Sequence, residues 1–182
     1  MRILIELPSW LGDTVMATPA IENLINFYSQ SEFVIVGSKI SIEVLKNHPN
    51  ISKIYELDKK YFSIFLLSKE LKRFDKFFTF RNSFRSNLFN FFIKSNEKFV
   101  YKKNDYKKNH QVEKYTKFIN NSLQKDYSIG PLVIYSSGLS RENLIIKNKK
   151  KPMLGINPGA SYGKAKRWYP EEFSEVIFAL SN

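Results

Sequence analysis

Two short loops in this chain hold the residues whose types and spacing fit catalytic chemistry. The first, residues 7–13, reads Leu-Pro-Ser-Trp-Leu-Gly-Asp, and the second, residues 157–168, reads Asn-Pro-Gly-Ala-Ser-Tyr-Gly-Lys-Ala-Lys-Arg-Trp. Each loop follows a short apolar run typical of a buried strand and leads into a helical pattern. We therefore expect both loops at the carboxyl ends of parallel strands, where open α/β folds bind ligands.

Asp13 is the carboxylate of the first loop, and it has two interpretations. As the residue that caps a helix, it would accept backbone N–H bonds and stabilise the helix by about 1 kcal/mol. As a residue facing a cleft, it would be a general base. That role suits glycosyl transfer, because the attacking hydroxyl becomes acidic only as its new bond to carbon forms. Gly12 either lets a substrate approach the backbone or satisfies a turn, and Trp10 is either a sugar platform or a packing residue.

The second loop combines glycine and serine with cations, and this composition suits a diphosphate. The residues in question are Gly159, Ser161, Gly163, Lys164, Lys166 and Arg167. Backbone N–H groups in such a turn, just before a helix, bind phosphate oxygens, and the cations add charge-assisted hydrogen bonds. The alternative is a flexible basic loop. A Walker A loop is excluded, because the spacing from Gly159 to Lys164 is one residue too short and Ala165 is not Ser or Thr.

The composition excludes several other kinds of site. The 182 residues contain no cysteine, so disulfides and thiolate metal sites are impossible. The two histidines, His48 and His110, lie far apart in sequence, and no two aspartates fall within two positions of each other. We therefore expect no metal and no cofactor. Glu6 interrupts the first apolar run, which argues against a secretory signal, and the apolar stretch at 61–67 is too short to span a membrane.

A net charge of +12 points to an anionic partner or to an AT-rich genome. The lysines form two clusters, and aromatic residues interleave with the first. The first cluster comprises Lys98, Lys102, Lys103, Lys107 and Lys108 with Phe99, Tyr101 and Tyr106, and the second comprises Lys147, Lys149, Lys150 and Lys151. A basic nucleic-acid-binding module is therefore an alternative function, although no RNA motif is recognised.

Strand and helix patterns alternate along the chain, which predicts an α/β fold with a parallel, Rossmann-like sheet. Strands are expected at 2–7, 33–36, 52–57, 76–80, 97–101, 132–135 and 153–157. Helices are expected at 14–29, 40–47, 61–73, 84–92, 110–124 and from Pro170 onward, with a kink or a late start caused by Pro19. Residues 136–151 have the composition of a linker. Residues 1–150 are thus predicted to form one domain with its linker, and residues 151–182 the first strand, loop and helix of an incomplete second Rossmann-like domain.

Three segments of the chain resemble a known family. They are residues 8–17 (Pro-Ser-Trp-Leu-Gly-Asp-x-Val-Met-Ala), residues 82–86 (Asn-Ser-Phe-Arg-Ser) and residues 158–168 (Pro-Gly-Ala-x-x-Gly-x-Ala-Lys-Arg-Trp). Together they are similar to the ADP-heptose–lipopolysaccharide heptosyltransferases of glycosyltransferase family 9, and most similar to the heptosyltransferase II group. The resemblance implies a two-domain GT-B fold and an inverting, metal-independent transfer of heptose from ADP-heptose to the lipopolysaccharide inner core.

The resemblance also implies roles for individual residues. Asp13 aligns with the catalytic base, and Lys166 with the lysine that contacts the donor diphosphate. The acceptor contacts would be Ser9, Trp10, Gly12, Asn82 and Arg85. The donor contacts would be Gly159, Ser161, Gly163, Lys164 and Lys166. The expected location is cytoplasmic, at the inner face of the inner membrane, where an anionic acceptor gives the basic clusters a purpose.

The chain departs from the family in length, since it covers about half of such an enzyme. The later segments expected around the nucleotide are missing, and so is the helix that would pack back on the first domain. Two alternatives therefore remain beside heptose transfer: an inactive truncated fragment of such an enzyme, and the nucleic-acid-binding protein considered above. The mechanism requires Asp13 and Lys166 to face one cleft between the two domains.

Overall fold

The computed structural model describes residues 1–58, 60–106, 109–135, 154–160 and 163–181. The chain divides into two compact units, Met1–Gly138 and Leu139–Asn182. The predicted linker at 136–151 lies outside the described residues. None of the helices in the described ranges combines the length and the apolar composition needed to cross a bilayer.

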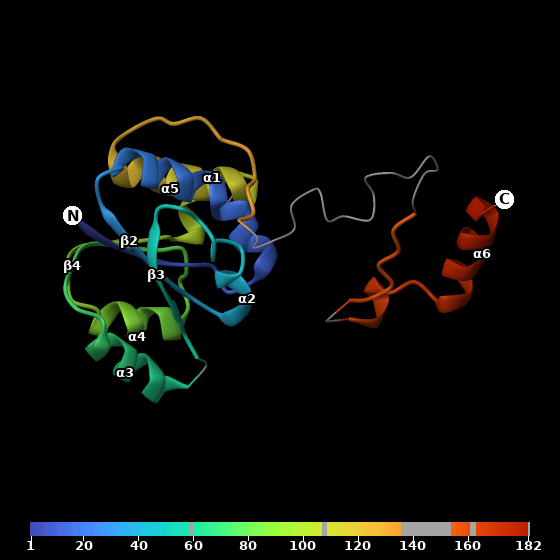
Figure 1. Ribbon diagram of the computed structural model, residues 1–182, viewed down its shortest axis with the longest axis horizontal. Helices are drawn as coiled ribbons and strands as arrows, with labels where there is room; N and C mark the ends of the chain where they lie inside the picture. The colour runs from blue at the N-terminus through green and yellow to red at the C-terminus, as the bar shows by residue number, and fades with distance from the viewer. Residues whose placement is uncertain (59, 107–108, 136–153, 161–162, 182) are drawn as a thin grey trace. The chain divides into compact units, whose positions relative to one another are not determined.

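The first unit is built on a five-stranded, fully parallel sheet (Figure 1). The strands are β1 (Arg2–Glu6), β2 (Glu32–Gly37), β3 (Ile51–Glu56), β4 (Phe74–Thr79) and β5 (Ser95–Val100). Their order is β3-β2-β1-β4-β5. Strands β2 and β3 therefore lie on one side of β1, and β4 and β5 lie on the other side. The predicted α/β class is confirmed. The order places a topological switch point between β1 and β4, which is where open α/β sheets bind ligands.

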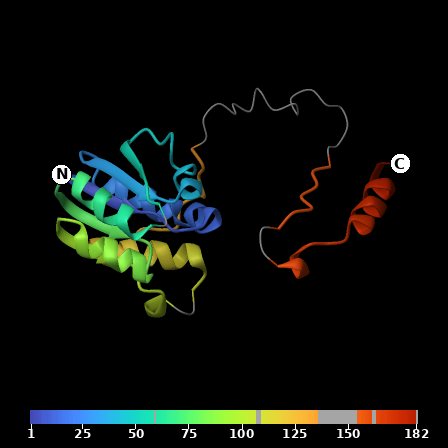
Figure 2. The ribbon, with the colours of Figure 1, turned by 90° about the horizontal axis from the view of Figure 1, so that it is seen from below.

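Helices cover both faces of the sheet, as Figures 1 and 2 show. They are α1 (Leu11–Phe27), α2 (Lys39–Ile42), α3 (Tyr61–Glu70), α4 (Phe84–Phe92), the short 3₁₀ helix η1 (Lys103–Tyr106) and α5 (Gln111–Leu123). Helices α1 and α5 pack on one face, and α3 and α4 on the other. The side chains of β1 alternate accordingly: Ile3 and Ile5 are buried in the core beneath α1 and α5, and Leu4 in the core beneath α3 and α4.

Helix α1 starts earlier than predicted and is not interrupted at Pro19. The helix begins at Leu11, three residues earlier than predicted, and continues through the proline. Proline has no N–H to donate to the carbonyl of Val15, four residues earlier. The Thr18 hydroxyl donates to that carbonyl instead, at 2.8 Å, so the polar group that the proline would leave unpaired is satisfied.

The strand expected at 132–135 is absent, and this prediction was wrong. Residues 131–135 have no regular structure and lie against the helical layer instead of adding to the sheet. The N–H of Val133 donates to the Thr18 hydroxyl at 3.0 Å, and the N–H of Tyr135 donates to the Val44 carbonyl at 2.8 Å. An apolar run forms a strand only where a neighbouring strand pairs with it, and these partners are a side chain and the turn that follows α2.

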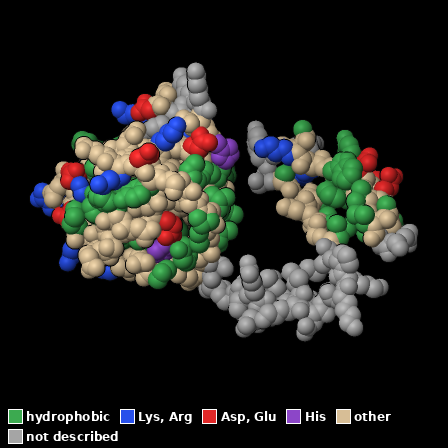
Figure 3. Space-filling view, turned by 90° about the horizontal axis from the view of Figure 1, so that it is seen from above, with side chains coloured by type: hydrophobic (Ala, Val, Ile, Leu, Met, Phe, Trp, Pro, Cys, Tyr) green, Lys and Arg blue, Asp and Glu red, His purple; other side chains and the backbone are tan. Residues whose placement is uncertain are grey.

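The second unit holds the short 3₁₀ helix η3 (Lys164–Lys166) and α6 (Pro170–Ser181). Helix α6 begins at Pro170, as predicted. The strand expected at 153–157 is not formed in the described residues 154–160, which contain no strand with which it could pair. Four apolar residues of α6 recur at the spacing of one helical face: Phe173, Val176, Ile177 and Leu180. Only Phe173 is half-buried and the other three are exposed, and Figure 3 shows hydrophobic side chains on the visible surface of this unit.

Candidate active site

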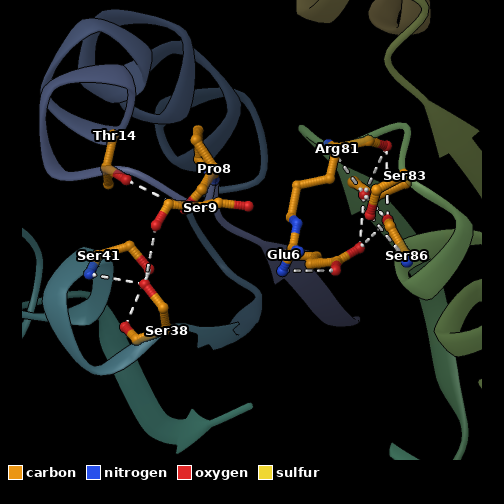
Figure 4. A network of polar contacts seen from close by, with 10 residues as sticks. Glu6, Pro8, Ser9, Thr14, Ser38, Ser41, Arg81, Ser83 and Ser86 are labelled. Atoms are coloured by element: carbon orange, nitrogen blue, oxygen red, sulfur yellow. Dashed lines mark hydrogen bonds and ion pairs between the residues drawn. The ribbon is translucent and has the colours of Figure 1, made fainter. Parts of the chain in front are cut away.

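The first predicted loop, which joins β1 to α1, is held by two hydroxyl side chains (Figure 4). Thr14, one turn into α1, donates to the carbonyl of Trp10 at 2.9 Å and lies 3.3 Å from that of Pro8. Ser38, at the end of β2, donates to the carbonyl of Ser9 at 3.0 Å. The loop backbone is therefore held by hydrogen bonds from α1 and from the residue after β2, although the Trp10 side chain is 70% exposed.

Asp13 is the third residue of α1 and does not cap the helix. Trp10 occupies the N-cap position and makes no side-chain capping bond, so the capping interpretation of Asp13 was wrong. A carboxylate in the first helical turn still interacts favourably with the helix dipole. The Asp13 side chain is half-buried and lines a pocket, which leaves it accessible to a ligand.

A pocket of about 210 Å³ lies at the carboxyl ends of β1 and β4, the switch point of the sheet. It is lined by Pro8, Ser9, Trp10, Asp13, Phe80, Arg81, Asn82, Ser83 and Tyr115. The structure thus brings together four residues that the sequence singled out, from two loops about seventy residues apart: Ser9, Trp10, Asp13 and Asn82. The other two predicted acceptor residues do not line it. Gly12 is exposed, with open space where a Cβ would stand, and Arg85 is half-buried on α4.

Tyr115 of α5 closes the pocket from the side of the helical layer. Its side chain is 4% exposed and its ring packs against those of Phe80 and Tyr101. Burial, followed by the negative charge of Asp13, raises the pKa of the Tyr115 phenol above its usual value of 10, so the group remains a neutral hydroxyl. The spacing in the sequence indicated only a core residue here, since Tyr115 falls in the apolar stripe of its helix.

Beneath the pocket lies a buried polar network around Glu6, which Figure 4 shows. Glu6 is fully buried at the end of β1, and one of its carboxylate oxygens accepts hydrogen bonds of 2.6 Å from the hydroxyls of Thr79 and Ser86. Its other oxygen lies 3.4 Å from Nη1 of Arg81. Arg85 also interacts electrostatically with Glu6 and Arg81. The network therefore joins β1, β4 and α4 at the base of the pocket.

Burial sets the protonation behaviour of this network. It raises the pKa of the Glu6 carboxyl above 4.5, and the two hydroxyl donors and the two arginines limit that rise. Burial also lowers the pKa of Arg81, an effect that the charge of Glu6 opposes. Neither Glu6 nor Arg81 belongs to a site predicted from the sequence. A signal was present in each case: an acidic residue inside a buried strand needs a partner, and Arg81 directly follows the end of a parallel strand.

The second predicted loop is described only in part. Ser161 and the side chain of Lys164 lie outside the described residues. Gly163 adopts a positive φ of 86°, a conformation that favours glycine, and the N–H of Lys166 donates to its carbonyl at 3.1 Å. The Lys166 side chain is exposed. The guanidinium of Arg167 instead donates to the Ala160 carbonyl at 2.6 and 3.1 Å, so this cation stabilises the loop itself.

The backbone N–H of Gly159 is directed into the loop, because it donates to the side-chain oxygen of Asn157 at 3.4 Å. A pocket of about 960 Å³ in this unit is mainly apolar and lies between this loop and α6. It is lined by Ile156, Pro158, Ala165, Arg167, Trp168, Tyr169, Pro170, Phe173 and Ile177. Of the predicted donor residues that the structure describes in full, Gly159, Gly163 and Lys166 do not line it.

Two further features of the sequence are its potential metal ligands and its first lysine cluster. No cluster of three or more potential metal ligands occurs among the described residues. The strand predicted at 97–101 is confirmed as β5 (Ser95–Val100), and it contains Lys98 and Phe99 of the first lysine cluster. Phe99 stacks on Phe78 with ring centroids 4.6 Å apart, and Tyr101 is 5% exposed. Tyr101 is therefore part of the core and offers no exposed platform for nucleic-acid bases, whereas Phe99 is half-buried.

Comparisons with known proteins identify the family. The sequence model of glycosyltransferase family 9 (heptosyltransferase) matches residues 64–182. Two curated relatives, the lipooligosaccharide heptosyltransferase 2 proteins of Campylobacter jejuni serotypes O:2 and O:6, are 40% and 38% identical to this chain. Each match covers the whole chain and 57% of the relative, so the chain spans little more than half their length.

Solved structures agree with this result at the level of the fold. A family 9 glycosyl transferase from Veillonella parvula superposes with a TM-score of 0.79 at 20% identity, covering 96% of this chain and 58% of that one. The ADP-heptose lipopolysaccharide heptosyltransferase II of Escherichia coli superposes with a TM-score of 0.65 at 22% identity, covering 99% and 61%. The resemblance found in the sequence motifs is confirmed, and the chain belongs to glycosyltransferase family 9, the heptosyltransferase family.

Proposed function

We propose that this chain supplies the acceptor-binding domain and the first donor-binding unit of an enzyme that transfers heptose from ADP-heptose to the lipopolysaccharide inner core. Its C. jejuni relatives carry the name lipooligosaccharide heptosyltransferase 2, and the E. coli structure is that of an ADP-heptose lipopolysaccharide heptosyltransferase. The observation that carries the proposal is the pocket at the switch point, which places the Asp13 carboxylate beside Ser9, Trp10 and Asn82.

In the proposed reaction, Asp13 is the general base. An acceptor hydroxyl in the pocket attacks the anomeric carbon of heptose from the face opposite to the ADP group. As the new C–O bond forms and the bond to ADP breaks, the hydroxyl proton passes to Asp13, and the configuration at that carbon inverts. Trp10 provides an exposed aromatic face for a sugar ring, and Ser9 and Asn82 provide hydrogen-bonding groups at the pocket rim.

The proposed donor contact is Lys166, whose exposed ammonium would stabilise the negative charge of the departing ADP. Lys164, Gly159, Ser161 and Gly163 belong to the same proposed diphosphate loop. The positive φ of Gly163 supports a turn of the kind that presents backbone N–H groups to phosphate. The proposed mechanism uses neither a metal ion nor a cofactor, and chelation with EDTA is expected to leave transfer unchanged.

The proposed partner is an anionic lipopolysaccharide core at the cytoplasmic face of the inner membrane, where the enzyme would act as a peripheral protein. The net charge of +12 supports this proposal, since lysine and arginine near an anionic lipid surface contribute about 1 kcal/mol each to association. Binding to anionic vesicles that decreases with salt is the expected observation.

A chimera provides the test of the proposed function. Residues 1–182 replace the matching part of the C. jejuni lipooligosaccharide heptosyltransferase 2, which supplies the remainder of the donor domain. With ADP-heptose and a heptose-deficient core acceptor, the chimera should release ADP and extend the acceptor by one heptose. Asp13→Asn should lower the rate by about 100-fold or more, and Asp126→Asn, at an exposed aspartate outside the pocket, should not.

The same assay separates the alternatives. If the chain is a fragment that is inactive by itself, the isolated chain transfers nothing and the chimera is active. An active chimera whose Asp13→Asn variant retains full turnover would remove Asp13 from the mechanism. A correctly folded chimera without transfer would contradict the proposed function.

A further inference from the structure

Arg81 has an unusual position for a cation at a pocket. Its side chain is 9% exposed, it lines the pocket together with Asp13, and it projects from the end of β4. Its Nε atom is enclosed and has no hydrogen-bond partner in the part of the chain that the structure describes. A guanidinium has five N–H donors and is costly to bury, and at least the Nε donor of Arg81 is left unused by the described residues.

Glu6 holds Arg81 in this position. The carboxylate cannot move freely, because the hydroxyls of Thr79 and Ser86 both bind one of its oxygens at 2.6 Å. The other oxygen faces Nη1 of Arg81, as Figure 4 shows. The Thr79 hydroxyl also accepts the backbone N–H of Arg81 at 3.1 Å, so the same anchor fixes both the main chain and the side chain of this residue.

In this cluster Arg81 forms an ion pair with Glu6, and Arg85 interacts electrostatically with both residues. Asp13 is the one acidic residue in the pocket lining, and no ion pair joins it to Arg81 among the described residues. Stability alone does not account for such a cluster, because replacing a buried ion pair with apolar residues is often neutral or stabilising. In this geometry the Arg81 guanidinium is positioned to bind an anionic ligand.

We infer that Arg81 binds an anionic group of the acceptor, a carboxylate or a phosphate, and that Glu6 is the positioning residue that holds Arg81 for this purpose. The inference rests on the proposed function, in which this pocket receives the acceptor. A guanidinium held by a buried carboxylate still presents parallel N–H donors, whose geometry matches the oxygens of a carboxylate or a phosphate. The anion would lie beside Asp13 and orient the sugar whose hydroxyl is deprotonated there.

The test measures binding to the 182-residue chain without donor and without transfer. The probes are glucuronate for a carboxylate, glucose 6-phosphate for a phosphate, and glucose as the neutral control. Binding is followed by the NMR signal of the Trp10 indole N–H, because Trp10 lines the pocket. The chain has two tryptophans, and Trp168→Phe identifies the signal of the other. At least one anionic probe should bind in the millimolar range, and glucose should bind much more weakly.

Arg81→Gln should weaken binding of the anionic probe about tenfold or more, as expected for the loss of a charge-assisted hydrogen bond. Arg81→Lys keeps the charge but lacks the fork, so it should also weaken binding and serves as a second variant should the first fail to fold. The matched control is Arg73→Gln, an exposed arginine at the opposite, amino end of β4, which is bound to Asn96. Circular dichroism checks that each variant is folded.

Glu6→Gln distinguishes a positioning role from a simple charge effect, because the two predict opposite signs. Removing a negative charge near the pocket would tighten anion binding if only the overall charge mattered. If Glu6 positions Arg81, binding weakens, although glutamine can still accept hydrogen bonds from Thr79 and Ser86. We expect the weaker binding, at about pH 8, where carboxyl groups ionise most completely.

Each outcome has a defined meaning. Binding of glucuronate alone or of glucose 6-phosphate alone supports the inference and names the anion. Failure of both probes to shift the Trp10 signal, or equal binding by wild type and both Arg81 variants, overturns it. Tighter binding by Glu6→Gln overturns the positioning role. Because no donor is present, a failure here is distinct from an inactive chimera, which would contradict the proposed function.

Discussion

Two acidic residues seven positions apart have opposite surroundings in this protein. Glu6 is fully buried, with every described contact made to the protein itself, whereas Asp13 is half-buried and open to a pocket. Such a difference in environment is how a fold assigns different tasks to chemically equivalent carboxyl groups. The half-buried group is open to a ligand, and the buried group holds other side chains.

The buried position of Glu6 gives a pH dependence whose sign can be stated. Burial raises its pKa in the folded state above 4.5, so above pH 4.5 the folded protein binds the proton more tightly than the unfolded chain does. The resulting stabilisation is fully present below that pH and is lost as the pH rises through the folded-state pKa. The melting temperature of wild type relative to Glu6→Gln should therefore increase as the pH falls from about 8 to about 5.

Thermal unfolding followed by circular dichroism measures this difference across the pH range. Glu56→Gln is the control, since Glu56 is exposed at the end of β3, and subtracting its profile removes the effect of the other titrating groups. A relative melting temperature that decreases toward acid pH would contradict the direction given for Glu6.

The sequence identified some members of this site and missed others for a physical reason. Ser9, Trp10 and Asp13 are recognisable because they share a single loop between a strand and a helix. Glu6 and Arg81 become partners only through the pairing of β1 with β4, in which Glu6 lies opposite Thr79. That register is a non-local property, and the pattern of residues near either position does not determine it.

At the scale of the element, α1 shows how a helix accommodates an internal proline at a functional position. The Thr18 hydroxyl replaces the missing amide at the Val15 carbonyl and also accepts the N–H of Val133. One side chain thus keeps the helix that carries Asp13 continuous and anchors the segment that leads out of the first unit. Thr18, which makes both contacts, is fully buried.

Thr18→Val should therefore destabilise the protein by about 1–3 kcal/mol, because it leaves a carbonyl and an amide without their partner at nearly constant side-chain shape. Thr116→Val in α5 is the matched control. The Thr116 hydroxyl also donates to a helical carbonyl, that of Val112, but no proline interrupts that helix. Urea denaturation should give a clearly smaller loss for Thr116→Val, and equal losses would show that the proline has no part in the effect.

Local signals predicted the helices better than the isolated strands. Helix α4 has the predicted bounds, Phe84–Phe92, and Ser83 caps it by accepting the N–H of Ser86. The strand expected at 132–135 is absent, and the one expected at 153–157 is not formed in the described residues 154–157, because an apolar run becomes a strand only when a neighbouring strand pairs with it. A capping residue and a helical stripe are contained in one segment, whereas strand pairing depends on distant parts of the chain.

At the scale of the whole molecule, the two units differ in how completely they bury their apolar side chains. The first unit has a core on each face of its sheet. In the second unit, Trp168, Tyr169, Phe178 and Leu180 are exposed. A fragment containing residues 1–138 should therefore unfold cooperatively, with a melting temperature within about 2–3 °C of the full chain. A molten fragment, or one that melts far lower, would show that the first unit depends on the second.

The division of the chain into two units also predicts a separation of binding from catalysis in the chimera. Lys166→Ala should weaken ADP binding about tenfold, since it removes a charge-assisted contact to the diphosphate, while the Asp13 pocket keeps its response to anionic sugars. Asp13→Asn should abolish transfer and leave ADP affinity within about twofold, because the nucleotide lies in the other unit of the proposed site. Isothermal calorimetry with ADP measures the first quantity, and steady-state transfer measures the second. Unchanged ADP affinity in Lys166→Ala would remove this lysine from the donor site, and an ADP affinity lost equally in both variants would mean that the two residues act as one binding site.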